Sequence, residues 1–132
     1  MKSTAFHILR VGTGITFIWI GVLIFREPES WGALLQPWAA GLVPVPLREA
    51  MIGTAILDIL VGLALLVDIS VFWAAAVGVF HIGTVLVTVG IETVTVRDIA
   101  IGAGLLALMA ETWPARLRRL RTGGIDAARG GV

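Results

Sequence analysis

Three side chains that could bind a polar ligand or carry a proton interrupt long apolar runs in this sequence. Asp58 lies within ILDILVGLALLV, His81 within VFHIGTVLV and Arg10 within FHILRVGTG. A carboxylate in the middle of a membrane-spanning helix costs on the order of 2.5–3.5 kcal/mol on insertion scales. We therefore expect Asp58 to have a partner, a function or both.

Two interpretations of these residues remain open from the sequence. In the first, Asp58, Arg10 and His81 form a buried polar centre that binds a polar head group or relays a proton. In the second, Arg10 and Asp58 form a structural pair that holds the helices in register, and His81 donates a hydrogen bond to a neighbouring helix.

A second polar set is expected where predicted helices end. It contains Arg26, Glu49, Arg97 and Asp98. The two arginines could converge beneath a tryptophan-bearing loop and receive an anion or a carbonyl group. The alternative is that all four are solvated anchors at the membrane surface.

The elements that would position these residues are long apolar helices. The chain has 132 residues, of which 58% are hydrophobic and 14% charged, whereas soluble domains average about 45–50% and about 25%. Runs long enough to cross a hydrocarbon core of roughly 30 Å occur at residues 5–25, 50–67, 71–89 and 96–113. We predict an all-α integral membrane four-helix bundle that occupies residues 1–114 as one domain.

The connection between the first two predicted spans, residues 26–47, contains four prolines and two tryptophans, Trp31 and Trp38. The prolines leave no run long enough for another span. We expect an interfacial or re-entrant segment, which serves either as a lid that faces a ligand or as a loop anchored by its tryptophans. Trp113 is predicted to be a further interfacial anchor, followed by a helix stop at Pro114.

Residues 115–132 form a basic tail that we predict to be largely disordered. Its cationic cluster consists of Arg116, Arg118, Arg119 and Arg121. Together with Lys2, this cluster predicts that both termini are cytoplasmic and that the tail contacts anionic lipid rather than nucleic acid.

Several kinds of chemistry are excluded or disfavoured by the sequence. The chain has no cysteine, so it has no thiolate nucleophile and no cysteine-ligated metal cluster. The two histidines, His7 and His81, are expected at different depths, which disfavours bis-histidine haem. We expect no metal site and identify no catalytic residue set. Any electrons would have to come from a bound cofactor or another subunit.

Three segments carry a resemblance to the DoxX family of small membrane proteins. They are WIGVLIF followed by Arg26, ILDILVGLALLV around Asp58, and VRDIAIGAGLLALM, which begins beside Arg97 and Asp98. The similarity extends over residues 6–112. Asp58 stands where glutamate is more usual in the family, and Arg26 where lysine is common.

The DoxX resemblance implies a four-span bundle in a bacterial or archaeal cytoplasmic membrane, with polar sites at Arg10, Arg26, Asp58, Arg97 and Asp98. It also implies a small membrane subunit of a quinone-linked oxidoreductase system, with quinone as ligand and a redox subunit as partner. A non-catalytic assembly subunit, which could form homo-oligomers, is the alternative. A small exporter fits the length, but the first span lacks the acid that such exporters carry.

Overall fold

The computed structural model describes residues 2–115, which form helices and turns and contain no β-strand. The long helices are α1 (Thr4–Arg26), α4 (Leu47–Leu66), α5 (Val71–Thr88) and α6 (Val96–Glu111), and two short helices, α2 (Pro28–Gly32) and α3 (Pro37–Ala40), lie between α1 and α4. The predicted basic cluster, Arg116, Arg118, Arg119 and Arg121, lies outside the described residues.

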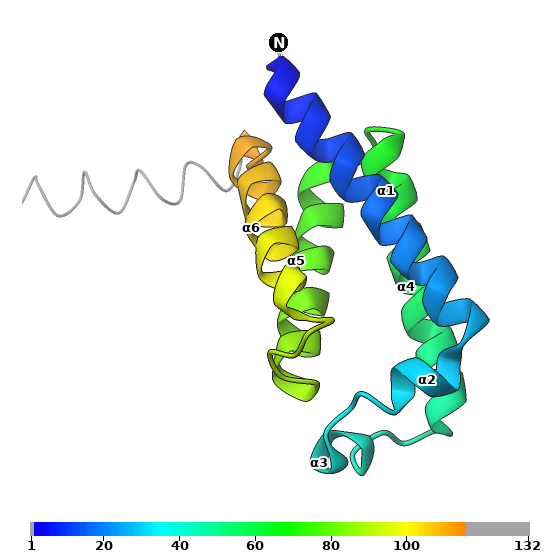
Figure 1. Ribbon diagram of the computed structural model, residues 1–132. Coiled ribbons are helices and arrows are strands. Elements are labelled where there is room, and N and C mark those ends of the chain that lie inside the picture. Colours follow the sequence, from blue (N-terminus) through cyan, green and yellow to red (C-terminus); the bar gives the residue numbers. More distant parts are fainter. Residues whose placement is uncertain (1, 116–132) are drawn as a thin grey trace, which may run out of the picture.

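The long helices run alternately up and down and pack as two pairs (Figure 1). α1 packs mainly against α4, and α5 packs mainly against α6. The short helices α2 and α3 lie at the end of the molecule opposite the N-terminus. At the other end, the Lys2 ammonium donates a hydrogen bond to the Glu111 carbonyl at 2.7 Å. The first and last described helices therefore meet at one end of the molecule.

Local signals explain where the helices begin and end. The Ser3 hydroxyl accepts a hydrogen bond from the Phe6 amide and caps α1. α2 and α3 each begin at a proline, which suits the first turn of a helix. The turn between α4 and α5 takes only four residues because Asp68 and Ser70 adopt left-handed backbone conformations, with φ of 60° and 47°.

Glycines allow α1 and α4 to approach closely. A Cβ added at Gly62 would lie 2.6 Å from the Gly14 carbonyl oxygen, and one at Gly21 would lie 2.7 Å from the Ala55 carbonyl oxygen. Such small residues permit backbone contact between membrane helices. The largest fully buried side chains of the core are Phe17, Leu65, Leu105 and Leu108.

Three described helices, α1, α4 and α5, are long and apolar enough to cross a membrane. They match the first three predicted spans closely, and a turn of four residues joins the second and third. α6 has 16 residues, fewer than a typical span needs. Residues 2–115 are thus all-helical, with three helices that could cross a membrane, and the fourth span stays a prediction.

The glycine contact predicts opposite effects for two substitutions in the same helix. Gly62→Ala should lower the free energy of unfolding by about 1–3 kcal/mol through overpacking against α1. Gly53→Ala should leave it unchanged or raise it slightly, because a Cβ at Gly53 meets nothing within 4 Å and alanine favours helix. Equilibrium unfolding in mixed detergent micelles measures both. Equal stability of the two variants would contradict the close α1–α4 contact.

Candidate functional site

A cavity of about 290 Å³ lies between the two helix pairs, and every described helix contributes to its lining, α2 through Trp31 alone. The lining is mostly apolar, with Phe17, Ile24, Met51 and Val85 among its side chains. This volume is near the lower end of the roughly 300–1,000 Å³ typical of small-molecule sites, which are likewise mostly apolar with a few polar groups. The cavity is the candidate functional site.

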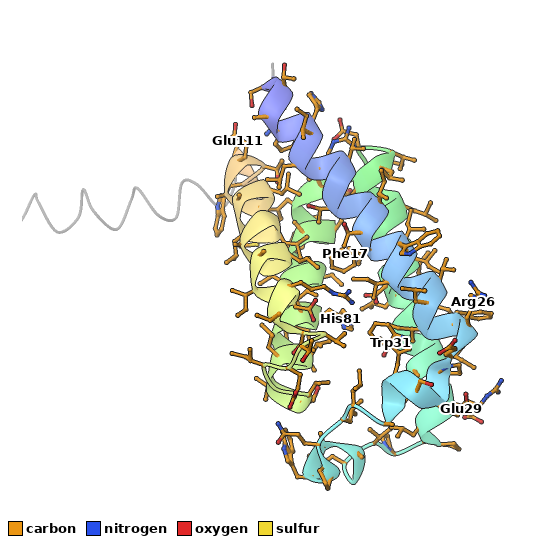
Figure 2. All side chains as sticks on the ribbon, viewed as in Figure 1. Phe17, Arg26, Glu29, Trp31, His81 and Glu111 are labelled. Carbon is orange, nitrogen blue, oxygen red and sulfur yellow. The ribbon has the colours of Figure 1, made fainter. Side chains whose placement is uncertain are left out.

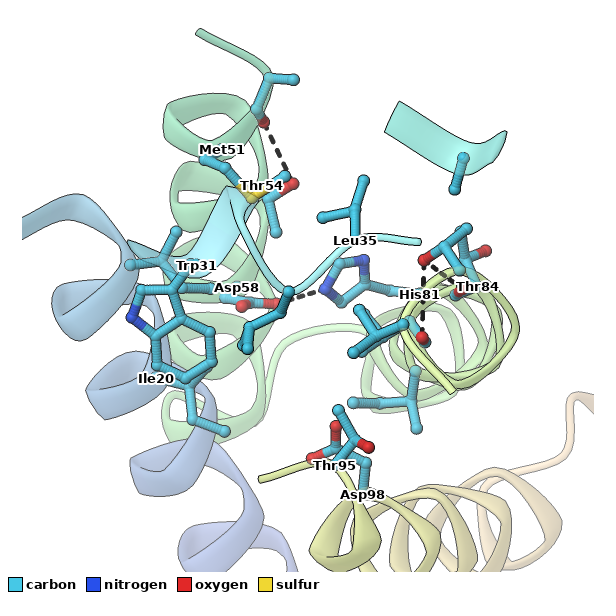
Figure 3. A pocket seen from close by; sticks show the side chains of 18 of the residues that line it. Ile20, Trp31, Leu35, Met51, Thr54, Asp58, His81, Thr84, Thr95 and Asp98 are labelled. Carbon is cyan, nitrogen blue, oxygen red and sulfur yellow. Dashed lines mark hydrogen bonds and ion pairs between the residues drawn. The ribbon is translucent and has the colours of Figure 1, made fainter. Parts of the chain in front are cut away.

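Asp58 and His81 meet across this cavity (Figure 3). The His81 Nε2 atom lies 3.1 Å from Asp58 Oδ1, and the side chains are 15% and 3% exposed. Despite this distance, Oδ1 is buried and has no hydrogen bond of good geometry. A buried carboxylate oxygen in this state is costly, and a ligand donor could satisfy it. The predicted partnership of Asp58 with His81 is therefore present.

Asp98 adds a second buried acid to the cavity wall. It lies in the first turn of α6 and is 6% exposed. The Arg97 Nε atom lies 3.8 Å from its Oδ1 atom, and the Arg97 side chain is half-exposed. Thr95, the residue just before α6, stabilises the connection to α5. Its hydroxyl donates to the Gly90 carbonyl and accepts from the Glu92 amide.

The segment between α1 and α4 closes one end of the cavity. Trp31 of α2 and the following Leu34 and Leu35 line it, and Figure 3 shows the Trp31 ring beside Asp58. The Gln36 amide donates to the Thr88 carbonyl at 2.9 Å, and its side-chain amide donates to the Val89 carbonyl at 3.3 Å. These bonds connect the segment to the end of α5, and its function as a lid stays a prediction.

Arg10 lies away from the cavity. Its guanidinium donates hydrogen bonds to the carbonyls of Leu65 and Leu66, the latter at 2.9 Å, and its Nε atom lies 3.6 Å from Asp68 Oδ1. These partners are at the C-terminal end of α4, seven or more residues beyond Asp58, or roughly 10 Å along a helix. Arg10 thus caps α4, whose terminal carbonyls favour a cation. The expected triad reduces to Asp58 and His81.

The other predicted residues are divided between cavity and surface. Arg97 and Asp98 line the cavity, whereas Arg26 is exposed at the end of α1, apart from the lining (Figure 2). Arg26 is not among the lining residues, so the structure does not bring it together with Arg97 at the cavity, as was expected.

Trp38 is half-exposed, and its indole donates to Gln36. Trp113 packs edge-to-face on Phe72 at a ring-centroid distance of 5.3 Å.

Trp31 is the residue whose role the sequence left most open. Of the two predicted anchors in residues 26–47, only Trp31 lines the cavity. In the structure it lies on a short helix whose Pro28 and Gly32 are buried, and no sequence signal distinguished it from Trp38.

No protein-family model, curated protein or solved structure matches the chain. The resemblance to the DoxX family therefore stays a prediction from the sequence. Within residues 2–115, no group of three or more His, Cys, Asp or Glu side chains is arranged to hold a metal ion.

The position of Arg10 predicts a structural effect. Arg10→Met should lower the free energy of unfolding by about 1.5–3 kcal/mol, because it removes charged hydrogen bonds to the end of α4. The matched control is Arg48→Met, which removes an ion pair with Glu29 at 2.9 Å between two well-exposed side chains and should cost less than about 1 kcal/mol. Detergent unfolding of both variants measures the difference, and similar losses would contradict the capping role.

Proposed function

We propose that this protein is a DoxX-like membrane protein that binds the head group of a lipid-soluble quinone, as a small membrane subunit of a quinone-linked oxidoreductase system. The observation that carries the proposal is the buried Asp58–His81 pair in the wall of an apolar cavity among membrane helices. A planar ring with polar carbonyl groups suits such a lining.

The two polar groups of the pair suit both oxidation states of a quinone. The His81 imidazole can donate a hydrogen bond to a ring carbonyl through Nε2. The Asp58 carboxylate can accept one from a ring hydroxyl, and its buried Oδ1 has capacity for such a bond. Both side chains can also accept or release a proton during turnover. A bound quinone would supply the two-electron redox chemistry.

The electrons would come from a partner subunit. The chain has no cysteine to hold an iron–sulfur cluster. A membrane subunit that presents a quinone to such a partner is consistent with the function implied by the DoxX resemblance.

The proposal also includes α6 as a fourth membrane span and a fixed orientation of the protein in the membrane. α6 is about 24 Å long at 1.5 Å per residue, and Thr112 and Trp113 extend it towards an interface. An even number of crossings would explain why Lys2 and Glu111 lie at one end. The basic residues that follow α6 in the sequence favour the cytoplasmic face of a bacterial or archaeal membrane for that end.

Quinone affinity should depend on Asp58 and His81. Asp58→Asn and His81→Leu should each weaken binding of a tailless methyl-benzoquinone by about 10- to 100-fold, the effect of losing one strong hydrogen bond. Binding to purified protein in nanodiscs can be measured by calorimetry.

Each of these substitutions has a matched control in the same chain. Asp68→Asn changes an exposed acid just beyond the C-terminal end of α4, and His7→Leu changes the exposed histidine of α1. Both should retain wild-type affinity. Normal binding by the Asp58 and His81 variants would overturn the proposed site. Co-purification of a stoichiometric partner with an active Asp58 variant would favour the assembly subunit instead.

The lid should contribute through Trp31 and not through Trp38. Trp31→Ala removes a ring that lines the cavity and should weaken quinone binding by about 3- to 10-fold, as expected for one aromatic contact. Trp38→Ala changes a half-exposed ring outside the lining and should have no effect. The same calorimetric titration compares the two variants. Equal losses would indicate that the segment is only an anchor.

A further inference from the structure

A second cavity of about 260 Å³ lies on the outer side of α1, beside the start of α6. Ile15, Thr16, Trp19 and Leu23 of α1 line it together with Ile20 and Arg97. The α1 residues are spaced as one stripe of a helix. Ile15 and Trp19 are 54% and 63% exposed, on a helix apolar enough to cross a membrane. The stripe would therefore face lipid.

Ile20 and Arg97 line both cavities. They form the boundary between the inner site, which holds Asp58 and His81, and the outer groove. This boundary lies where α1 meets α6, a contact much less extensive than that of α1 with α4. Ile20 and Arg97 are therefore the residues at which the inner site adjoins the outer groove.

The outer groove suits a hydrocarbon chain. Its surface is apolar apart from Arg97 and Thr16, and the Thr16 hydroxyl already donates to the Gly12 carbonyl at 2.9 Å. The Arg97 guanidinium is half-exposed and only loosely paired with Asp98, at 3.8 Å. It could donate to a carbonyl or ether oxygen on the ring, at the point where a tail leaves the inner cavity.

We infer that Ile20 and Arg97 form a lateral portal, through which the ring of a quinone enters the inner cavity from the bilayer while its hydrocarbon tail remains in the groove of residues 15–23. This inference rests on the proposed quinone function and names the path and the tail site. The inner cavity, at about 290 Å³, has room for a ring, and the outer groove offers a separate apolar surface for a tail. Trp31 and Leu35 of the α1–α4 connection line another part of the inner cavity, and Gln36 bonds this segment to the end of α5.

The test compares two probes, a benzoquinone with a ten-carbon alkyl tail and the same ring with a methyl group instead. Wild-type protein in nanodiscs should bind the tailed probe at least tenfold more tightly. Ile15→Trp fills the groove without altering the inner lining and should abolish this advantage, while affinity for the methyl probe stays the same. Ile8→Trp, at an exposed α1 position that lines neither cavity, should retain the advantage.

A second measurement needs no substitution. A diazirine at the end of the ten-carbon tail should label the α1 peptide that contains residues 15–23. If Ile15→Trp fails to fold, this label decides the matter, since adducts confined to other segments would overturn the portal.

The outcomes separate the portal from the proposed function. If wild-type protein binds both probes equally, or the tail advantage survives Ile15→Trp, the portal is wrong and the quinone site stands. If neither probe binds to wild-type protein, the quinone function fails and the portal fails with it.

Discussion

The need to keep one carboxylate away from lipid organises much of this structure. Asp58 occurs in the apolar part of a helix that is long enough to cross a membrane, and its side chain is 3% exposed. Gly21 of α1 lies opposite it, where an added Cβ would be 3.2 Å from the Asp58 Cβ. The glycine lets α1 cover that side of the acid, while His81 of α5 meets it from across the cavity. The polar pair thus lies inside the protein, where an ionisable group is tolerated within a membrane.

The same glycine packing helps to explain why a cavity is present. α1 and α4 are drawn together at Gly14 and Gly62, and α5 and α6 pack as a second pair. Large side chains such as Phe17 and Leu105 fill the space between the pairs on one side of the cavity. Towards α2 the pairs lie further apart (Figure 1), and the wall there includes smaller side chains such as Thr54. The bundle is therefore closely packed around the core residues and contains the cavity in its other part.

The sequence predicted the helices better than the site. Apolar runs identified three membrane helices within a few residues, because length and hydropathy determine them. The short connection between the second and third spans suggested a similar depth for Asp58 and His81, but their contact comes from the structure. The position of Arg10 could not be predicted, since the sequence gives a residue's depth within its own helix but not the offset between α1 and α4. Trp31 was equally open, because a tryptophan suits both a membrane interface and a ligand cavity.

Because α6 is short, the polar residues at its start reach the same cavity as the polar residues in the middle of α4 and α5. The sequence placed these two sets apart. Arg97 lies beside residues 15–23 of α1 rather than beside Arg26 at the end of that helix. A charged helix start that would normally anchor at the membrane surface is therefore drawn to the cavity. Asp98 is buried and lines the same cavity as Asp58. Arg97 lies between the inner cavity and the outer groove. One helix that begins deep in the bundle thus supplies both a second acid and the boundary with lipid.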